Sequence, residues 1–176
     1  MRRTAALLGL VLLGIALVVL VRPPERPPPP GERGHRIFRL SPHAVRGVDV
    51  AQGERSFSAR RTADGWTIDG KTANTHTTEA LDDLVTMLAT LRAVDVFRHE
   101  DPSHFGLEQP TGTITLVTGR GERRLVLGAP NLASTALYAR RDGDPRLLQV
   151  GSMLLSALDR VFYRRDQDEP RKADVR

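Results

Sequence analysis

The densest group of residues that could do chemistry lies in one short stretch, His99-Glu100-Asp101-Pro102-Ser103-His104. It resembles the zinc-binding pattern His-Glu-x-x-His, whose two histidines share one face of a helix. Here the histidines are five positions apart with Pro102 between them, so that helical geometry is excluded. The remaining metal hypothesis is a loop site made by His99, Asp101 and His104, and the alternative is a polar surface loop. We favour the surface loop, and therefore predict no metal ligands and no cofactor.

Other residues with chemical potential have simpler interpretations. Asp82 and Asp83 are adjacent in a predicted helix, so their carboxylates point about 100° apart and do not converge; their place in the first two turns suits the helix dipole. Gly119-Arg120-Gly121 lacks the third glycine of a nucleotide-binding loop and joins two predicted strands, which indicates a hairpin turn. Ser134 and Thr135 have no base nearby in the sequence. We therefore predict no catalytic residues and no enzymatic activity.

The charge and cysteine content narrow the functional classes. The chain has 26 Lys and Arg against 21 Asp and Glu, which gives a formal net charge of +5. These basic residues are scattered among the acids, with no long basic run and no interleaved aromatic residues for base stacking, so we predict no nucleic-acid partner. The absence of cysteine excludes disulfides, thiol catalysis and thiolate metal sites.

The longest apolar stretch is Ala5–Val21, which contains no charged residue and no proline. As a helix it would extend about 25 Å, at the short end of what crosses a bilayer core. Arg2 and Arg3 precede it, so the positive-inside bias predicts a cytoplasmic N-terminus. The alternatives are a cleaved signal peptide and a buried core helix. We favour an uncleaved single-pass anchor in the inner (cytoplasmic) membrane, because bulky residues and prolines stand where a cleavage site would need small ones.

Four segments are predicted along the chain. Residues 1–22 form a cytoplasmic stub and the transmembrane anchor, and residues 23–35 form a proline-rich spacer in an extended polyproline conformation. Residues 36–163 form one domain that faces the periplasm or the exterior. Residues 164–176 lack apolar content, which is typical of a disordered tail.

The expected fold class is α+β, with the transmembrane helix followed by a mostly antiparallel sheet in two strand groups, each followed by an amphipathic helix. In the first group, Ile37–Leu40 is extended, Val45–Val50 alternates at period two, and Asp64-Gly65 signals a hairpin. An apolar stripe with helical spacing predicts a helix over Thr77–Val94, capped by Thr77 or Thr78. The second group precedes a closing helix after Ser152, and its strands are Thr113–Thr118, Arg123–Leu127, Ala136–Arg140 and Leu147–Val150.

Several side chains are expected to face the core. They occupy inward positions of the alternating strands, and they are Trp66, Ile68, Ile114, Leu116, Leu125 and Leu127.

The order of these elements resembles a bacterial family described as a domain of unknown function, over roughly Val45–Leu158. The resemblance rests on the sequence Phe105-Gly-Leu-Glu-Gln-Pro110, which matches an aromatic-Gly-Leu-x-x-Pro signature, and on the features around it. Gly106 permits a backbone conformation closed to other residues, Leu107 can fill the core beneath the loop, and Pro110 biases the preceding residue to extended geometry. We therefore interpret the signature residues as structural: Trp66, Phe105, Gly106, Leu107, Pro110, Gly128 and Tyr138.

This resemblance implies where in the cell the protein acts, and it implies no catalytic residue. Members of the family often neighbour auxiliary components of gliding-type ABC transport systems and usually carry an N-terminal membrane anchor. By resemblance, we expect a non-catalytic interaction domain and accessory subunit of an envelope transport or motility assembly. Its expected partners are the membrane, through Ala5–Val21, and other envelope proteins. The alternatives are an envelope ligand- or glycan-binding module and, less favoured, a metal-dependent hydrolase that uses the loop from His99 to His104.

Overall fold

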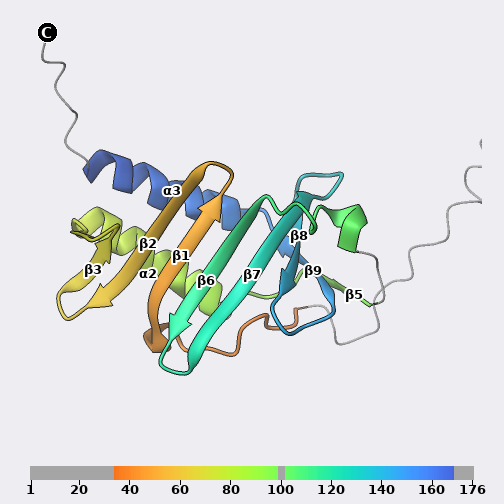
Figure 1. The fold of residues 1–176 in the computed structure, drawn as a ribbon, viewed down its shortest axis with the longest axis horizontal. Coiled ribbons are helices and arrows are strands. Elements are labelled where there is room, and N and C mark those ends of the chain that lie inside the picture. Colours follow the sequence, from red (N-terminus) through yellow and green to blue (C-terminus); the bar gives the residue numbers. More distant parts are fainter. Residues whose placement is uncertain (1–33, 99–101, 169–176) are drawn as a thin grey trace, which may run out of the picture.

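A computed structural model describes residues 34–98 and 102–168 of the chain. The described part has two layers, a wide antiparallel sheet and two helices that pack side by side behind it (Figure 1). The helices are α2 (Thr75–Thr90) and α3 (Met153–Asp168), and two short 3-10 turns are η1 (Pro42–Ala44) and η2 (Pro102–Phe105). The strands are β1 (Val45–Gln52), β2 (Arg55–Thr62), β3 (Gly65–Ile68), β4 (Lys71–Thr72), β5 (Asp95–Phe97), β6 (Gly112–Thr118), β7 (Gly121–Pro130), β8 (Ala136–Arg141) and β9 (Leu147–Gly151).

The sheet is built outward from its centre in both directions. Its strand order is β4-β3-β2-β1-β6-β7-β8-β9-β5. The strands form two series along the chain, β1 to β4 and β6 to β9. The first strands of the two series, β1 and β6, pair antiparallel in the middle of the sheet, with Asp49 opposite Thr115. Each series then runs to one side by hairpins and returns through a helix, α2 after β4 and α3 after β9. One consequence is that the turn between β6 and β7 lies at the same end of the sheet as the chain entering β1 (Figure 1).

The core lies between the sheet and the helices and is mainly aliphatic. Alternating residues on the strands point toward the helices because side chains on a strand have a period of two. The six side chains predicted to face the core are all buried, with exposed fractions of 4% or less. Of the predicted apolar stripe, Leu81, Leu84, Val85 and Leu88 are buried in α2, whereas Leu91 is half-buried at the C-cap of the helix.

The first hairpins follow the sequence closely. Gly65 has a φ of +134°, so the turn at Asp64-Gly65 uses the backbone freedom that glycine supplies. Trp66 is 1% exposed and its Nε1 donates a hydrogen bond of 3.0 Å to Asp82 on α2. The guanidinium of Arg61 lies 4.5 Å above the same indole ring. The hairpin predicted at Asp64-Gly65 is confirmed by the antiparallel pairing of β2 with β3, and the short strand β4 pairs with β3 beyond it.

The predicted fold class is wrong in its transmembrane helix and is corrected there. No helix within residues 34–98 and 102–168 is long and apolar enough to cross a membrane. The segment predicted to do so, Ala5–Val21, lies outside the described residues, so the described fold consists of the sheet and its two helices alone. The two strand groups belong to one sheet, because β1 of the first group pairs with β6 of the second. The α+β character and the antiparallel pairing agree with the prediction.

Some element boundaries also differ from prediction. Ile37 and Phe38 are buried, but they lie in an irregular segment held by an isolated bridge between Arg36 and Arg92 rather than in a strand. Helix α2 begins earlier than expected, because the side chain of Asn74, a better capping residue than threonine, accepts a hydrogen bond from the backbone N–H of Thr77.

The ends of both helices are set by neighbouring residues. Helix α2 ends at Thr90, where Leu91 turns to extended geometry, so it is shorter than predicted at this end. Helix α3 continues to Asp168, into the segment predicted to be a disordered tail. The extra turn is held by tertiary contacts, since Arg165 donates to the carbonyl oxygen of Ser56 at 2.6 Å and Asp168 accepts from Asn74.

Candidate functional site

A cleft of about 560 Å³ opens at the end of the sheet where the chain enters β1. Three segments form its walls: residues 38–46, the turn between β6 and β7, and the end of β8. These segments are distant in the sequence, and the central pairing of β1 with β6 brings the first two together. The charged or titratable side chains in the lining are Arg39, His43, Arg46, Arg120, Arg123 and Arg141.

The charged or titratable residues that line this arginine cleft are all basic. Among the residues that the structure describes, the lining contains five arginines and one histidine, and no Asp or Glu. Within the described part of the chain, no ion pair joins Arg39, Arg46 or Arg120 to a carboxylate, and all three side chains are exposed. Arg141 is paired with Asp144, and the guanidinium groups of the other four arginines in one concave surface raise the local positive potential, which attracts and concentrates anions. The cleft is therefore suited to bind carboxylates or phosphates.

The turn between β6 and β7, which forms one wall of the cleft, is held by hydrogen bonds of Thr118. The hydroxyl of Thr118 donates to the carbonyl oxygen of Gly121 at 2.7 Å and accepts from the backbone N–H of Arg120 at 3.2 Å. The guanidinium of Arg46 lies against Gly119, so close that a Cβ at this glycine would stand 3.3 Å from the Cζ of Arg46. The turn thus lies beside Arg46 of β1 and contains Arg120, so two of the cleft's arginines come together here.

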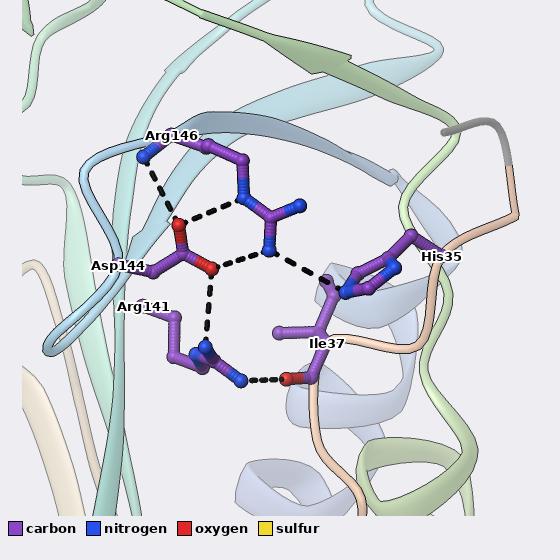
Figure 2. Close-up of polar contacts among 5 residues, drawn as sticks. All are labelled: His35, Ile37, Arg141, Asp144 and Arg146. Atoms are coloured by element: carbon purple, nitrogen blue, oxygen red, sulfur yellow. Dashed lines mark hydrogen bonds and ion pairs between the residues drawn. The ribbon is translucent and has the colours of Figure 1, made fainter. Parts of the chain in front are cut away.

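Arg141 belongs both to the cleft and to a part-buried network of hydrogen bonds, which Figure 2 shows. Its Nη1 donates to the carbonyl oxygen of Ile37 at 2.8 Å, and its Nη2 donates to Asp144 Oδ2 at 3.1 Å. Asp144 also accepts from Arg146, through Nε at 2.9 Å, Nη2 at 2.7 Å and the backbone N–H at 3.1 Å. The carboxylate is therefore surrounded by donors from two arginines.

This environment stabilises the charged form of Asp144. The residue is 9% exposed. The hydrogen bonds from Arg146 lower the pKa of Asp144 to about 2, although burial acts in the opposite direction. Arg146 Nη2 also lies 3.4 Å from Nε2 of His35. Because His35 and Ile37 precede the cleft residues 38–46 in the chain, the network fastens one wall of the cleft to the hairpin of β8 and β9.

The residues of the predicted signature gather mostly at the other end of β7. The ring centroid of Phe105 lies 4.6 Å from that of Tyr138 on β8, and the ring centroid of Phe97 on β5 lies 6.4 Å from it. Gly106 has a φ of +70°, and a Cβ there would stand 2.9 Å from the backbone nitrogen of Ala129. This loop thus packs directly on the backbone of β7.

The remaining signature residues lie around this contact, except Trp66. A Cβ at Gly128 would stand 2.3 Å from the carbonyl oxygen of Phe105, so only glycine fits. Leu107 is buried against Gly128 but lies outside the main core cluster. Pro110 is exposed just before β6. Trp66 is on β3, far along the sheet, under α2. None of these residues lines the arginine cleft.

One protein family has a model that matches most of the chain. This family, described as "Domain of unknown function (DUF4340)", is matched by residues 33–110 and 98–165. The chain belongs to this family. No curated protein and no solved structure matches it. The matched residues cover the sheet, both helices and the arginine cleft.

The other residues singled out by the sequence stay apart in the DUF4340 domain. His99 and Asp101 lie outside the described residues, and His104 is exposed in η2. Among residues 34–98 and 102–168, no group of three or more His, Asp or Glu residues is arranged to hold a metal ion. Ser134 has a φ of +55° in the turn before β8, and Thr135 donates its backbone N–H to Asn131. Asp82 binds Trp66 and Arg61, while Asp83 contacts Arg160.

Sequence reasoning did not find the arginine cleft of this DUF4340 domain. Its arginines are widely separated along the chain, so no basic run marks them. The signal that could have revealed it is the pairing of the two central strands, which places Arg46 beside the turn containing Arg120. Local patterns predict strands well, but they do not say which strands become neighbours.

Proposed function

We propose that this DUF4340 domain is a non-catalytic interaction domain that binds another protein of the cell envelope through the arginine cleft. The observation that carries the proposal is the set of exposed arginines in that cleft, which have no carboxylate partner within the described residues. Positive charges held close together in a concave site repel one another, and an anionic partner that binds there relieves this repulsion. Arginine is also the basic residue most enriched in protein interfaces.

The finer proposal concerns the assembly. The similarity to proteins found beside gliding-type ABC transport components supports a role as an accessory subunit of such an envelope transport or motility assembly. A location of the domain on the outer side of the cytoplasmic membrane belongs to the same proposal. A rigid sheet with its contact residues at one end suits a subunit that docks on a larger assembly, because little ordering entropy is lost on binding.

The alternative of a glycan-binding module receives less support from the geometry. Such sites use exposed aromatic rings as platforms, and the lining of the arginine cleft contains neither Trp nor Tyr. Trp66 is buried, and Tyr138 is contacted by two phenylalanine rings. Tyr163 is 60% exposed on α3, where Arg164 lies over its ring.

Site-directed photo-crosslinking in the producing cells tests the proposal. A photoreactive amino acid replaces Ser41, an exposed residue of the cleft, and in a matched control it replaces Arg164 on α3. We expect a specific envelope protein to be crosslinked from position 41 and not from position 164. The crosslink should weaken in the double variant Arg39→Gln/Arg120→Gln. Identical crosslinking patterns from both positions would contradict the proposal.

A further inference from the structure

We propose that the occupant of the arginine cleft is an extended acidic segment of the partner protein, an inference that rests on the proposed function and names the chemistry of its partner. The positive groups are spread over three walls: Arg39, His43 and Arg46 on one, Arg120 and Arg123 on the second, and Arg141 on the third. Such a spread matches several carboxylates placed along a chain better than one compact anion.

The size of the cleft and the nature of its hydrogen-bond donors also favour an extended acidic segment. A volume of about 560 Å³ is typical of sites for ligands much larger than a single phosphate group. Compact phosphate sites usually use backbone N–H groups at a helix N-terminus. Here the backbone N–H of Arg120 is bonded to Thr118, and that of Ala44 to the carbonyl oxygen of Ser41. The available donors are guanidinium groups, which bind carboxylates in a bidentate geometry with two parallel N–H···O hydrogen bonds.

The apolar part of the lining distinguishes a polypeptide from a nucleic acid. Leu40 is half-buried and Ala44 is exposed, so both offer apolar contact to side chains between the acidic residues. Phe38 also lines the cleft, but it is 1% exposed and cannot present a ring face for base stacking. An acidic segment with small apolar residues between its carboxylates therefore fits this surface.

One of the arginines is held in position before binding. Arg141 is fixed by Ile37 and Asp144, so it loses little rotamer freedom when a carboxylate arrives. Arg39, Arg46 and Arg120 are exposed and can adapt to the spacing of the acidic residues. The cleft thus combines one guanidinium held by hydrogen bonds with exposed guanidinium groups that can change rotamer.

Fluorescence anisotropy on the purified full chain tests this inference. The probe is a short labelled peptide of alternating Glu and Ala, and the matched control peptide has Gln in place of Glu. We compare Arg39→Gln/Arg120→Gln with Arg160→Gln/Arg164→Gln, a pair on α3 outside the cleft that lowers the net charge equally. Circular dichroism melting of each variant shows whether the fold is retained.

We expect the Glu peptide to bind, the Gln peptide not to bind, and added salt to weaken the complex. The cleft variant should lower affinity about three- to tenfold, because each exposed ion pair contributes modestly, and the α3 variant should leave it unchanged. Equal losses in both variants would overturn the inference, since net charge alone would explain them. Failure of the Glu peptide to bind would also overturn it, whether anionic phospholipid vesicles or inorganic phosphate bind in its place.

The inference and the proposed function fail in different ways. If position 41 is crosslinked to an envelope protein whose contacting peptide has no acidic residues, the proposed function stands and the acidic segment is overturned. If the Glu peptide binds through the cleft arginines but no protein is crosslinked from position 41, the chemistry of the cleft stands and the protein-binding role is contradicted.

Discussion

Arg141 donates a hydrogen bond of 2.8 Å to the carbonyl oxygen of Ile37, which precedes it by 104 positions. The bond joins the irregular segment at the start of the domain to the outer strands of the sheet. The second terminal nitrogen of the Arg141 guanidinium, Nη2, donates a hydrogen bond to Asp144, so the position of Arg141 depends on that carboxylate. The stability of the fold and the shape of the arginine cleft are therefore linked through Asp144.

Replacing Asp144 by Asn should destabilise the domain. The side chain is 6% exposed, and removing its charge takes away the carboxylate to which both Arg141 and Arg146 are paired. Breaking one side of such a buried pair is expected to lower the free energy of unfolding by about 2–4 kcal/mol. Urea denaturation followed by circular dichroism measures this change. The control is Asp142→Asn, whose side chain is 62% exposed, and a loss as large in the control would refute the assignment.

The contribution of Asp144 should depend on pH in the acid range. Its pKa in the folded protein is about 2, below the ordinary value of 3.8, so its stabilisation is present above pH 4 and is lost as the pH falls toward 2. The size of the shift corresponds to about 2–3 kcal/mol. Unfolding free energies of the wild-type protein and Asp144→Asn should therefore converge between pH 4 and pH 2. Parallel curves through this range would show that the carboxylate does not titrate as described.

Gly128→Ala should be strongly destabilising. A Cβ at this position would stand 2.3 Å from the carbonyl oxygen of Phe105, so the loop carrying Phe105 must move away from β7. We expect the free energy of unfolding to fall by about 2–4 kcal/mol, as for other substitutions that force backbone apart. Gly151→Ala is the matched control, because it also lies in a strand and has no atom within 4 Å of the added Cβ. Thermal melting that shifts equally for both variants would argue against the close approach.

The part of the fold that could be predicted from the sequence was set by local patterns. The alternation around Ile114 and Leu125 and the Asp64-Gly65 turn predicted strands that the structure confirms. Three features could not be predicted because they depend on tertiary contacts: the joining of the two strand groups through β1 and β6, the irregular path of Ile37, and the extension of α3 to Asp168. The arginine cleft belongs with these, since it exists only where those contacts bring its walls together.

Thr77→Val should leave the domain as stable or make it more stable. Thr77 is fully buried in the first turn of α2, and its hydroxyl oxygen has no hydrogen-bond partner within the described residues. Valine has nearly the same shape and is also β-branched, so the substitution removes the unsatisfied polar group without opening a cavity. The backbone N–H of Thr77 still donates to the Asn74 side chain, so the helix cap is retained.

We expect the free energy of unfolding of Thr77→Val to rise by up to about 1 kcal/mol in urea denaturation. Thr86→Val, on the exposed side of the same helix, is the control and should change stability by less than about 0.5 kcal/mol. A clear loss of stability in Thr77→Val alone would mean that the hydroxyl has a partner in solution, such as a buried water. In that case the hydroxyl of Thr77 would contribute to the stability of the first turn of α2.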